Sequence, residues 1–178
     1  TGANALWLTP VFASTPKAGQ DSWTDKLDAT GYYASDYFNV DPKFGTNAKF
    51  KELVNAAHQK GLYVFMDGVF GHFKDNLVAS PMGRLPALTN TCVGSSGTFA
   101  AGAHQKCADY ADPASVAFFK EVATHWVTEY KIDGWRLDQA YQVPTAIWAD
   151  IRNSVQSASQ SVTYLNQGGA SVKPLGHM

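Results

Sequence analysis

Residues 131–138 read Lys-Ile-Asp-Gly-Trp-Arg-Leu-Asp, a predicted strand that ends in the carboxylate of Asp138. Arg136 and Asp138 are two residues apart, so their side chains project from the same face of a strand. A guanidinium beside a carboxylate favours the ionised carboxylate. The pattern leaves two interpretations open, a charged nucleophile and a structural ion pair. Asp133, just before the strand, is expected to be a structural turn carboxylate.

Two further runs have the same apolar character. Residues 5–8 (Ala-Leu-Trp-Leu) are ended by Thr9-Pro10, and residues 62–66 lead into Asp67. Continuous apolar runs of this length are typical of strands buried on both faces of a parallel sheet. Because ligands bind at the carboxyl ends of such strands, Asp67 and Asp138 are expected to share one cleft.

Helices are predicted between these strands. One helix follows Thr46-Asn47, which can cap its start, and ends near Gly61, with an apolar face that includes Leu53. A second helix opens with Asp112 as N-cap and Pro113 in its first turn, and a third begins near Pro144. The alternation of strands and helices predicts an α/β fold with a parallel sheet, open or closed into a barrel. A complete eightfold barrel needs roughly 250 residues, so the chain is expected to hold about half of one.

The composition is that of an ordinary globular protein, with 45% hydrophobic residues and a net charge of −1. Near-zero charge gives no reason to expect a nucleic acid or an anionic membrane as partner. No apolar run approaches the ~20 residues of a membrane helix. The start at Thr1, without a basic and apolar leader, is expected of a fragment or a processed chain.

Residues 73–112 show no readable period and are expected to form an irregular insertion. They contain both cysteines, Cys92 and Cys107. A disulfide between them is favoured over two unrelated thiols, because a segment with little core of its own gains most from a cross-link. A disulfide implies an oxidising compartment, so a secreted or periplasmic protein is expected.

Two more side chains are candidates for a binding site. His72 follows Asp67 by five residues, which places it at the mouth of the predicted cleft; the other histidines considered, His58, His104 and His125, are expected to be structural or exposed. Tyr32 follows Gly31 in the loop after the first strand, a loop that also contains Trp23. Aromatic rings of this kind stack on the apolar faces of sugars.

These motifs, in this order, resemble the α-amylase family of glycoside hydrolases. Residues 4–10 resemble the second barrel strand, 31–46 the loop after it, 66–72 the third-strand signature and 133–138 the fourth. The resemblance implies a partial (β/α)8 TIM barrel over residues 1–72 and 113–178. Residues 73–112 would then be an irregular domain B, inserted after the third strand.

The resemblance also implies roles for the candidate residues. Asp138 would be the nucleophile and Arg136 the residue that keeps it ionised. His72 would hydrogen-bond the sugar being cleaved, Tyr32 would stack under that sugar, and Asp67 would support the base of the pocket. Tyr141 and Gln142 stand where many family members have a Lys-His pair that contacts sugar.

Calcium is implied by the same resemblance. Asp109 lies in a short acidic motif that provides a calcium ligand in the family, and the backbone carbonyl near Gln142 is another contributor. The family usually has Asn before the third-strand histidine, often as a calcium ligand, but this chain has Gly71. Glycine offers no side-chain oxygen, which puts the ion in question.

Retaining hydrolysis needs a second carboxyl group as general acid/base, a glutamate after the fifth strand in this family. The only glutamates, Glu52, Glu121 and Glu129, fall in predicted helices. The expected function is therefore that of a parent enzyme that cleaves α-1,4-glucosidic bonds in starch-like glucans or maltooligosaccharides and needs the remainder of the barrel. The alternatives are a transglycosylase such as a cyclodextrin-forming enzyme, a non-catalytic glucan-binding homologue and an unrelated open α/β domain.

Overall fold

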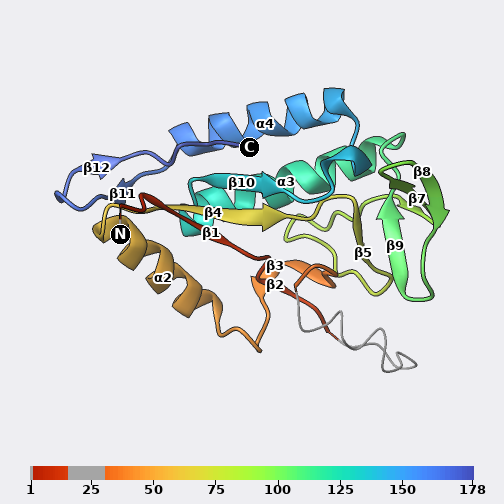
Figure 1. Ribbon diagram of the computed structural model, residues 1–178, viewed down its shortest axis with the longest axis horizontal. Helices are drawn as coiled ribbons and strands as arrows, with labels where there is room; N and C mark the ends of the chain where they lie inside the picture. Colours follow the sequence, from red (N-terminus) through yellow and green to blue (C-terminus); the bar gives the residue numbers. More distant parts are fainter. Residues whose placement is uncertain (1, 16–30) are drawn as a thin grey trace.

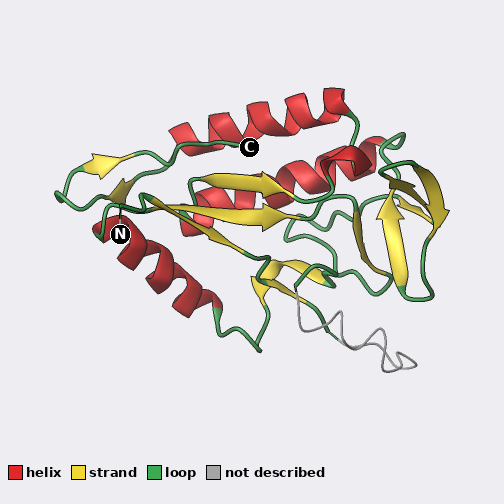
Figure 2. Cartoon of the chain, viewed as in Figure 1, coloured by secondary structure: helices red, strands yellow, loops and turns green. Residues whose placement is uncertain are grey.

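The computed structural model describes residues 2–15 and 31–178, so Trp23 lies outside the described residues. Three central strands form a parallel sheet in the order β1-β4-β10: β1 (Ala5–Leu8), β4 (Tyr63–Gly68) and β10 (Gly134–Leu137) (Figure 1). The helices around it are α2 (Asn47–Gln59), α3 (Pro113–Tyr130) and α4 (Thr145–Gln160) (Figure 2). The predicted parallel α/β arrangement is confirmed.

The register of the sheet aligns the carboxyl ends of its strands. Leu8 pairs with Met66, and Arg136 pairs with Asp67. On the far side of β10, His177 forms an isolated parallel bridge with Gly134. The last residues of the chain therefore run alongside β10 in the direction of a further parallel strand.

Only one face of the sheet is packed against the helices. Val64, Met66 and Trp135 are buried in a core shared with the apolar faces of α2, α3 and α4. On the opposite face Trp7 is 62% exposed and the Arg136 side chain 43% exposed. The prediction that these strands are buried on both faces is wrong for this face, because no described helix packs on it.

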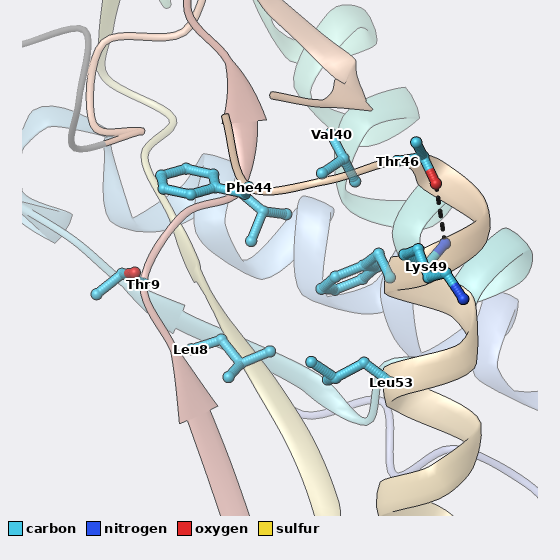
Figure 3. A pocket seen from close by; sticks show the side chains of 9 residues that line it. Leu8, Thr9, Val40, Phe44, Thr46, Lys49 and Leu53 are labelled. Carbon is cyan, nitrogen blue, oxygen red and sulfur yellow. Dashed lines mark hydrogen bonds between the residues drawn. The ribbon is translucent and has the colours of Figure 1, made fainter. Parts of the chain in front are cut away.

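The helix ends follow the predicted capping residues. The Thr46 hydroxyl accepts a hydrogen bond from the Lys49 amide at the start of α2, and the Asp112 side chain accepts one from the Ala114 amide at the start of α3. Leu53 departs from its predicted burial and is 44% exposed. It lines an apolar groove of about 290 Å³ between β1 and α2 (Figure 3). No described helix is long and apolar enough to cross a bilayer.

The loop after β1 contains a strand pair that the sequence analysis missed. β2 (Phe12–Ala13) and β3 (Asp36–Val40) are antiparallel. Tyr37 of β3 is fully buried and donates its hydroxyl proton to the Val69 carbonyl. A two-residue strand has no period to read, and its pairing depends on a partner more than twenty residues away.

Residues 73–112 are more regular than predicted. β5 (His72–Lys74), β9 (Gln105–Ala108) and β6 (Leu88–Thr89) form an antiparallel sheet in the order β5-β9-β6. β7 (Thr91–Gly94) and β8 (Gly97–Ala100) form a hairpin, and after α4 a second hairpin joins β11 (Tyr164–Leu165) to β12 (Ser171–Val172).

The predicted disulfide is present. Cys92 of β7 and Cys107 of β9 are bonded, with a Cα–Cα distance of 5.4 Å. The bond connects the hairpin to the three-stranded sheet. The expectation that residues 73–112 are irregular is wrong, because their strands of two to four residues are too short to show an alternating pattern in the sequence.

Candidate active site

Asp67 is the centre of a polar cluster at the carboxyl end of β4. Its carboxylate is completely buried. Oδ2 accepts a hydrogen bond of 2.7 Å from the Tyr32 hydroxyl, and Oδ1 accepts one of 2.9 Å from Trp7 Nε1 and one of 3.2 Å from Arg136 Nη1. Burial of a charged carboxylate is costly unless it is paired and hydrogen-bonded, and here three donors meet that need.

Arg136 connects Asp67 to Asp138. The same Nη1 atom that contacts Asp67 donates to Asp138 Oδ1 at 2.7 Å. This hydrogen bond is the main cause of the raised pKa of Arg136. The guanidinium Cζ also lies 5.1 Å from the centre of the Trp7 ring, within range of a cation–π contact. The backbone amide of Asp138 donates to the Gly68 carbonyl, so the end of β10 is held against the end of β4.

Tyr32 reaches the cluster from the loop before β3. Gly31 has φ +73°, and a Cβ atom there would lie 2.1 Å from the Pro10 carbonyl oxygen, so only glycine allows the chain to pass this close to the end of β1. Burial and the hydrogen bond to Asp67 raise the pKa of Tyr32 to about 12. The hydroxyl therefore stays protonated and acts as a donor to Asp67.

His72 lies at the start of β5 and is buried. Its Nδ1 atom is 2.8 Å from Gln142 Oε1, and its ring centre is 4.9 Å from that of Tyr33. Burial lowers the pKa of His72, and the negative charge of Asp138 partly opposes this shift. His72 is therefore neutral near pH 7 and lies within electrostatic reach of Asp138.

The structure brings most of the predicted site residues together. Tyr32, Asp67, Arg136 and Asp138 form one connected hydrogen-bond network, with His72 beside it. Tyr141, in the short 3-10 helix η2 (Ala140–Gln142), is exposed, and its hydroxyl donates to the Gln139 side chain.

The remaining predicted residues have other partners. The Asp109 carboxylate accepts a hydrogen bond from the Ala111 amide and closes a local turn. The Gln142 side chain is buried and bonded to His72 and Gln139.

The residues around Asp109 and Gly71 fit calcium poorly. Calcium takes six to eight oxygen ligands. A Cβ atom at Gly71 would lie 2.1 Å from Gln142 Oε1, so the Gln142 side chain fills the space that an asparagine would need. Within residues 2–15 and 31–178, no three His, Cys, Asp or Glu side chains gather closely enough to hold a metal ion. We assign no catalytic step to calcium.

Trp7 is the site residue that the sequence analysis missed. The apolar run at residues 5–8 predicts only a buried strand residue here, but the indole N–H donates to Asp67. The available signal was chemical, because a tryptophan in a strand needs an acceptor for its N–H. The identity of that acceptor depends on the pairing of β1 with β4, which no local pattern specifies.

Comparison with known proteins supports a single family. Residues 1–79 match the family described as "Alpha amylase, catalytic domain". The chain is 29% identical to a cyclomaltodextrinase of Geobacillus thermopakistaniensis over 93% of this chain and 29% of that protein. It is 58% identical to a structure described as AmyP in complex with maltose, with a TM-score of 0.85 over 98% of this chain and 32% of that one. The chain thus spans about a third of the length of these relatives.

One expectation is contradicted by the relatives. Two proteins of Bacillus subtilis, each 27% identical over 97% of this chain and 29% of its own length, are named intracellular maltogenic amylase. The secreted or periplasmic location inferred from the cysteine pair is therefore wrong. The proximity of two sulfur atoms is a property of local geometry, and it does not by itself determine the compartment of a protein.

The matched relatives cover the strands that carry Asp67, Arg136 and Asp138. The family description, the relatives and the solved structures agree with one another and with the geometry of the cluster. The chain belongs to the α-amylase family.

Proposed function

We propose that the protein carrying this chain is a retaining glycoside hydrolase that cleaves α-1,4-glucosidic bonds in starch-like glucans, with Asp138 as its nucleophile. The observation that carries the proposal is the 2.7 Å hydrogen bond from Arg136 to Asp138, made by a guanidinium that also contacts the buried Asp67. This arrangement keeps a carboxylate charged at the open end of parallel strands.

The proposed reaction is a double displacement. The ionised Asp138 attacks the anomeric carbon, the glycosidic C–O bond breaks, and a general acid protonates the leaving oxygen. Water, deprotonated by the same group acting as a base, then cleaves the glycosyl–Asp138 bond. Arg136 stabilises the Asp138 carboxylate before the attack and again after the covalent intermediate is hydrolysed.

No glutamate of this chain is placed to be that general acid. Glu121 accepts hydrogen bonds from Ser80 and Arg84 on the outer side of α3, and Glu52 pairs with Lys49 on α2. Glu129 lies near the end of α3, in the turn before Lys131. We therefore assign the general acid to a part of the protein outside these residues.

The remaining site residues are proposed to bind the sugar. Tyr32 has its hydroxyl fixed on Asp67, which orients the ring for stacking under a glucose unit. His72, neutral at working pH, would hydrogen-bond sugar hydroxyls beside Asp138. Tyr141 is exposed and available to an acceptor-side sugar, whereas both polar atoms of the Gln142 amide are already bonded within the protein.

The fold we infer for this function is a partial (β/α)8 barrel. β1, β4 and β10 would be its second, third and fourth strands, and residues 73–112 would be domain B. The open face of the sheet, with Trp7 and Arg136, would then line the barrel interior. Structural relatives cover nearly all of this chain, which supports the assignment.

The substrate class is supported by the names of the relatives. The solved structures similar to this chain include AmyP in complex with maltose and its E221Q form in complex with maltotriose. The curated relatives include cyclomaltodextrinases, maltogenic amylases and a neopullulanase. These names support a hydrolase of α-glucans over a cyclodextrin-forming transglycosylase.

The test is the substitution Asp138→Asn in the intact protein. Loss of the nucleophile should lower kcat on maltooligosaccharides roughly 10³-fold or more, about 4 kcal/mol of activation free energy. Binding of maltotriose, measured by calorimetry, should survive. The matched control is Asp150→Asn, a half-exposed residue of α4 that pairs with Lys120 of α3, which should leave kcat unchanged. Near-normal turnover by Asp138→Asn would show that the nucleophile is misassigned.

A further inference from the structure

Gln142 joins two segments that lie far apart in the sequence. It belongs to η2, which follows β10, and its side chain is almost completely buried. Gln142 Oε1 is 2.8 Å from Nδ1 of His72, seventy residues earlier, and Gln142 Nε2 donates to Gln139 Oε1 at 2.9 Å. Because an amide oxygen only accepts hydrogen bonds, this contact places a proton on Nδ1 of His72.

Gly71 makes room for this amide. A Cβ atom at residue 71 would lie 2.1 Å from Oε1 and 2.3 Å from Cβ of Gln142. The second distance involves the base of the glutamine side chain, which cannot move away without a shift of η2. A side chain at residue 71 and the Gln142 side chain therefore exclude each other.

The same volume corresponds to the position where the family often has its calcium-binding asparagine. In this chain the asparagine is absent, and the carboxylate of Asp109 is engaged by the Ala111 amide. The Gly71 carbonyl accepts a hydrogen bond from the Ala108 amide of β9, so the segment before His72 is already bound to the sheet of residues 73–112. Hydrogen bonds within the chain thus hold together the segments that a bound ion would otherwise connect.

We propose that Gln142 is a positioning residue that replaces calcium in this protein. Its amide fixes the ring of His72 and ties β5 to the segment after β10, and Gly71 is the residue that permits it. The effect of Gln142 on catalysis rests on the proposed function. Its effect on metal dependence does not.

The first arm of the test measures metal dependence in the intact protein. After treatment with a chelator, the melting temperature and the secondary structure should be the same with and without added calcium chloride. Atomic emission should detect no calcium in the purified protein. One equivalent of bound calcium, together with a lower melting temperature after chelation, would overturn the proposal.

The second arm compares two substitutions of equal length. Gln142→Met removes the acceptor that fixes the His72 ring. The hydrogen bond from His72 to the bound sugar should weaken, so KM for maltotriose should rise about tenfold with little change in kcat. Gln142→Glu keeps an acceptor for His72 at the same reach and loses the donor to Gln139, so its KM should rise less than about threefold. Gln156→Ala, on the exposed side of α4, is the control for a general effect.

The outcomes separate the two proposals. Equal KM values for Gln142→Met and Gln142→Glu would overturn the positioning role. If the unaltered protein does not turn over any α-glucan, the proposed function fails, while the calcium measurements still decide whether Gln142 replaces the ion. If Gln142→Met does not fold, the same measurements and the KM of Gln142→Glu remain decisive.

Discussion

At the scale of the residue, Asp67 is a buried carboxylate that holds other residues of the site in place. Its carboxylate has no contact with solvent, yet three donors from three different segments reach it. One of them, Arg136, also donates a hydrogen bond to Asp138 and so connects the two carboxylates. The position of the proposed nucleophile therefore depends on Asp67 and on the donors that surround it.

Trp7 tests this dependence. Trp7→Phe keeps a ring against Arg136 but removes the N–H that Asp67 accepts. A hydrogen bond to a charged group contributes about 1.5–3 kcal/mol, so kcat/KM on maltotriose should fall by roughly tenfold or more. Tyr63→Phe, on the partly exposed start of β4, is the control. An unchanged kcat/KM in Trp7→Phe would mean that Asp67 does not need this donor.

At the scale of the element, Asp133 holds the other end of the sheet. The sequence predicted a structural turn carboxylate, and the structure confirms it. Oδ2 accepts hydrogen bonds from the Val64 amide and from His58 Nε2 of α2, both at 2.8 Å. Tyr164 of β11 donates to Oδ1 and stacks on the His58 ring at 3.5 Å. A single side chain thus connects β4, α2 and the β11–β12 hairpin.

Replacement of Asp133 by Asn should be strongly destabilising. An asparagine can accept hydrogen bonds at only one oxygen, and each buried donor left without its acceptor costs about 1–3 kcal/mol, so the free energy of unfolding of the intact protein should fall by at least about 2 kcal/mol in urea titrations. Asp150→Asn breaks the partly exposed pair with Lys120 and should cost less than about 1 kcal/mol. Equal losses in the two variants would contradict the role of Asp133.

The helix α3 carries a group that makes stability depend on pH. Burial lowers the pKa of His125, whose ring packs 5.1 Å from that of Phe38. The nearby charges of Glu129, Glu121 and Asp36 act in the opposite direction. The unfolded chain therefore binds a proton at His125 at a higher pH than the folded chain does. The contribution of His125 to the free energy of unfolding is present in full above about pH 6.5, and it is lost as the pH falls.

His125→Phe should remove that part of the pH dependence. The melting temperature of the intact protein should fall less between pH 7 and pH 5 in the variant than in the unaltered protein. Some dependence should remain, because burial also lowers the pKa of His72. Identical melting profiles for the two proteins would show that His125 does not titrate in this range.

At the scale of the whole molecule, the chain has one packed face and one open face. The helices cover the face with Val64, Met66 and Trp135, while Trp7 and Arg136 lie on the other. The catalytic carboxylate that we assign, Asp138, lies at the rim of the open face.

These 178 residues by themselves should not hydrolyse soluble starch. They hold the proposed nucleophile, Asp138, but no glutamate near it that can protonate the leaving oxygen, and retaining hydrolysis needs both groups. The release of reducing ends should therefore stay at the level of a blank, whereas under the proposed function the intact protein should release them under the same conditions. Turnover by the isolated chain would require a different mechanism.

The sequence alone was sufficient for features that depend on near neighbours. The caps Thr46 and Asp112, the short apolar runs that form β1, β4 and β10, and the pairing of Arg136 with Asp138 arise from residues a few positions apart. The disulfide was also predicted, although its implied compartment was wrong. The strands within residues 73–112 escaped prediction because each has only two to four residues, too few to show an alternating pattern.

Only the tertiary structure decided which donors surround Asp67, which face of the sheet stays open, and what occupies the space beside Gly71. The contacts of Trp7 with Asp67 and of Gln142 with His72 span sixty and seventy residues. Such contacts depend on strand register and on the volume left by neighbouring backbone. Both are set when the chain closes on itself, and neither leaves a periodic trace in the sequence.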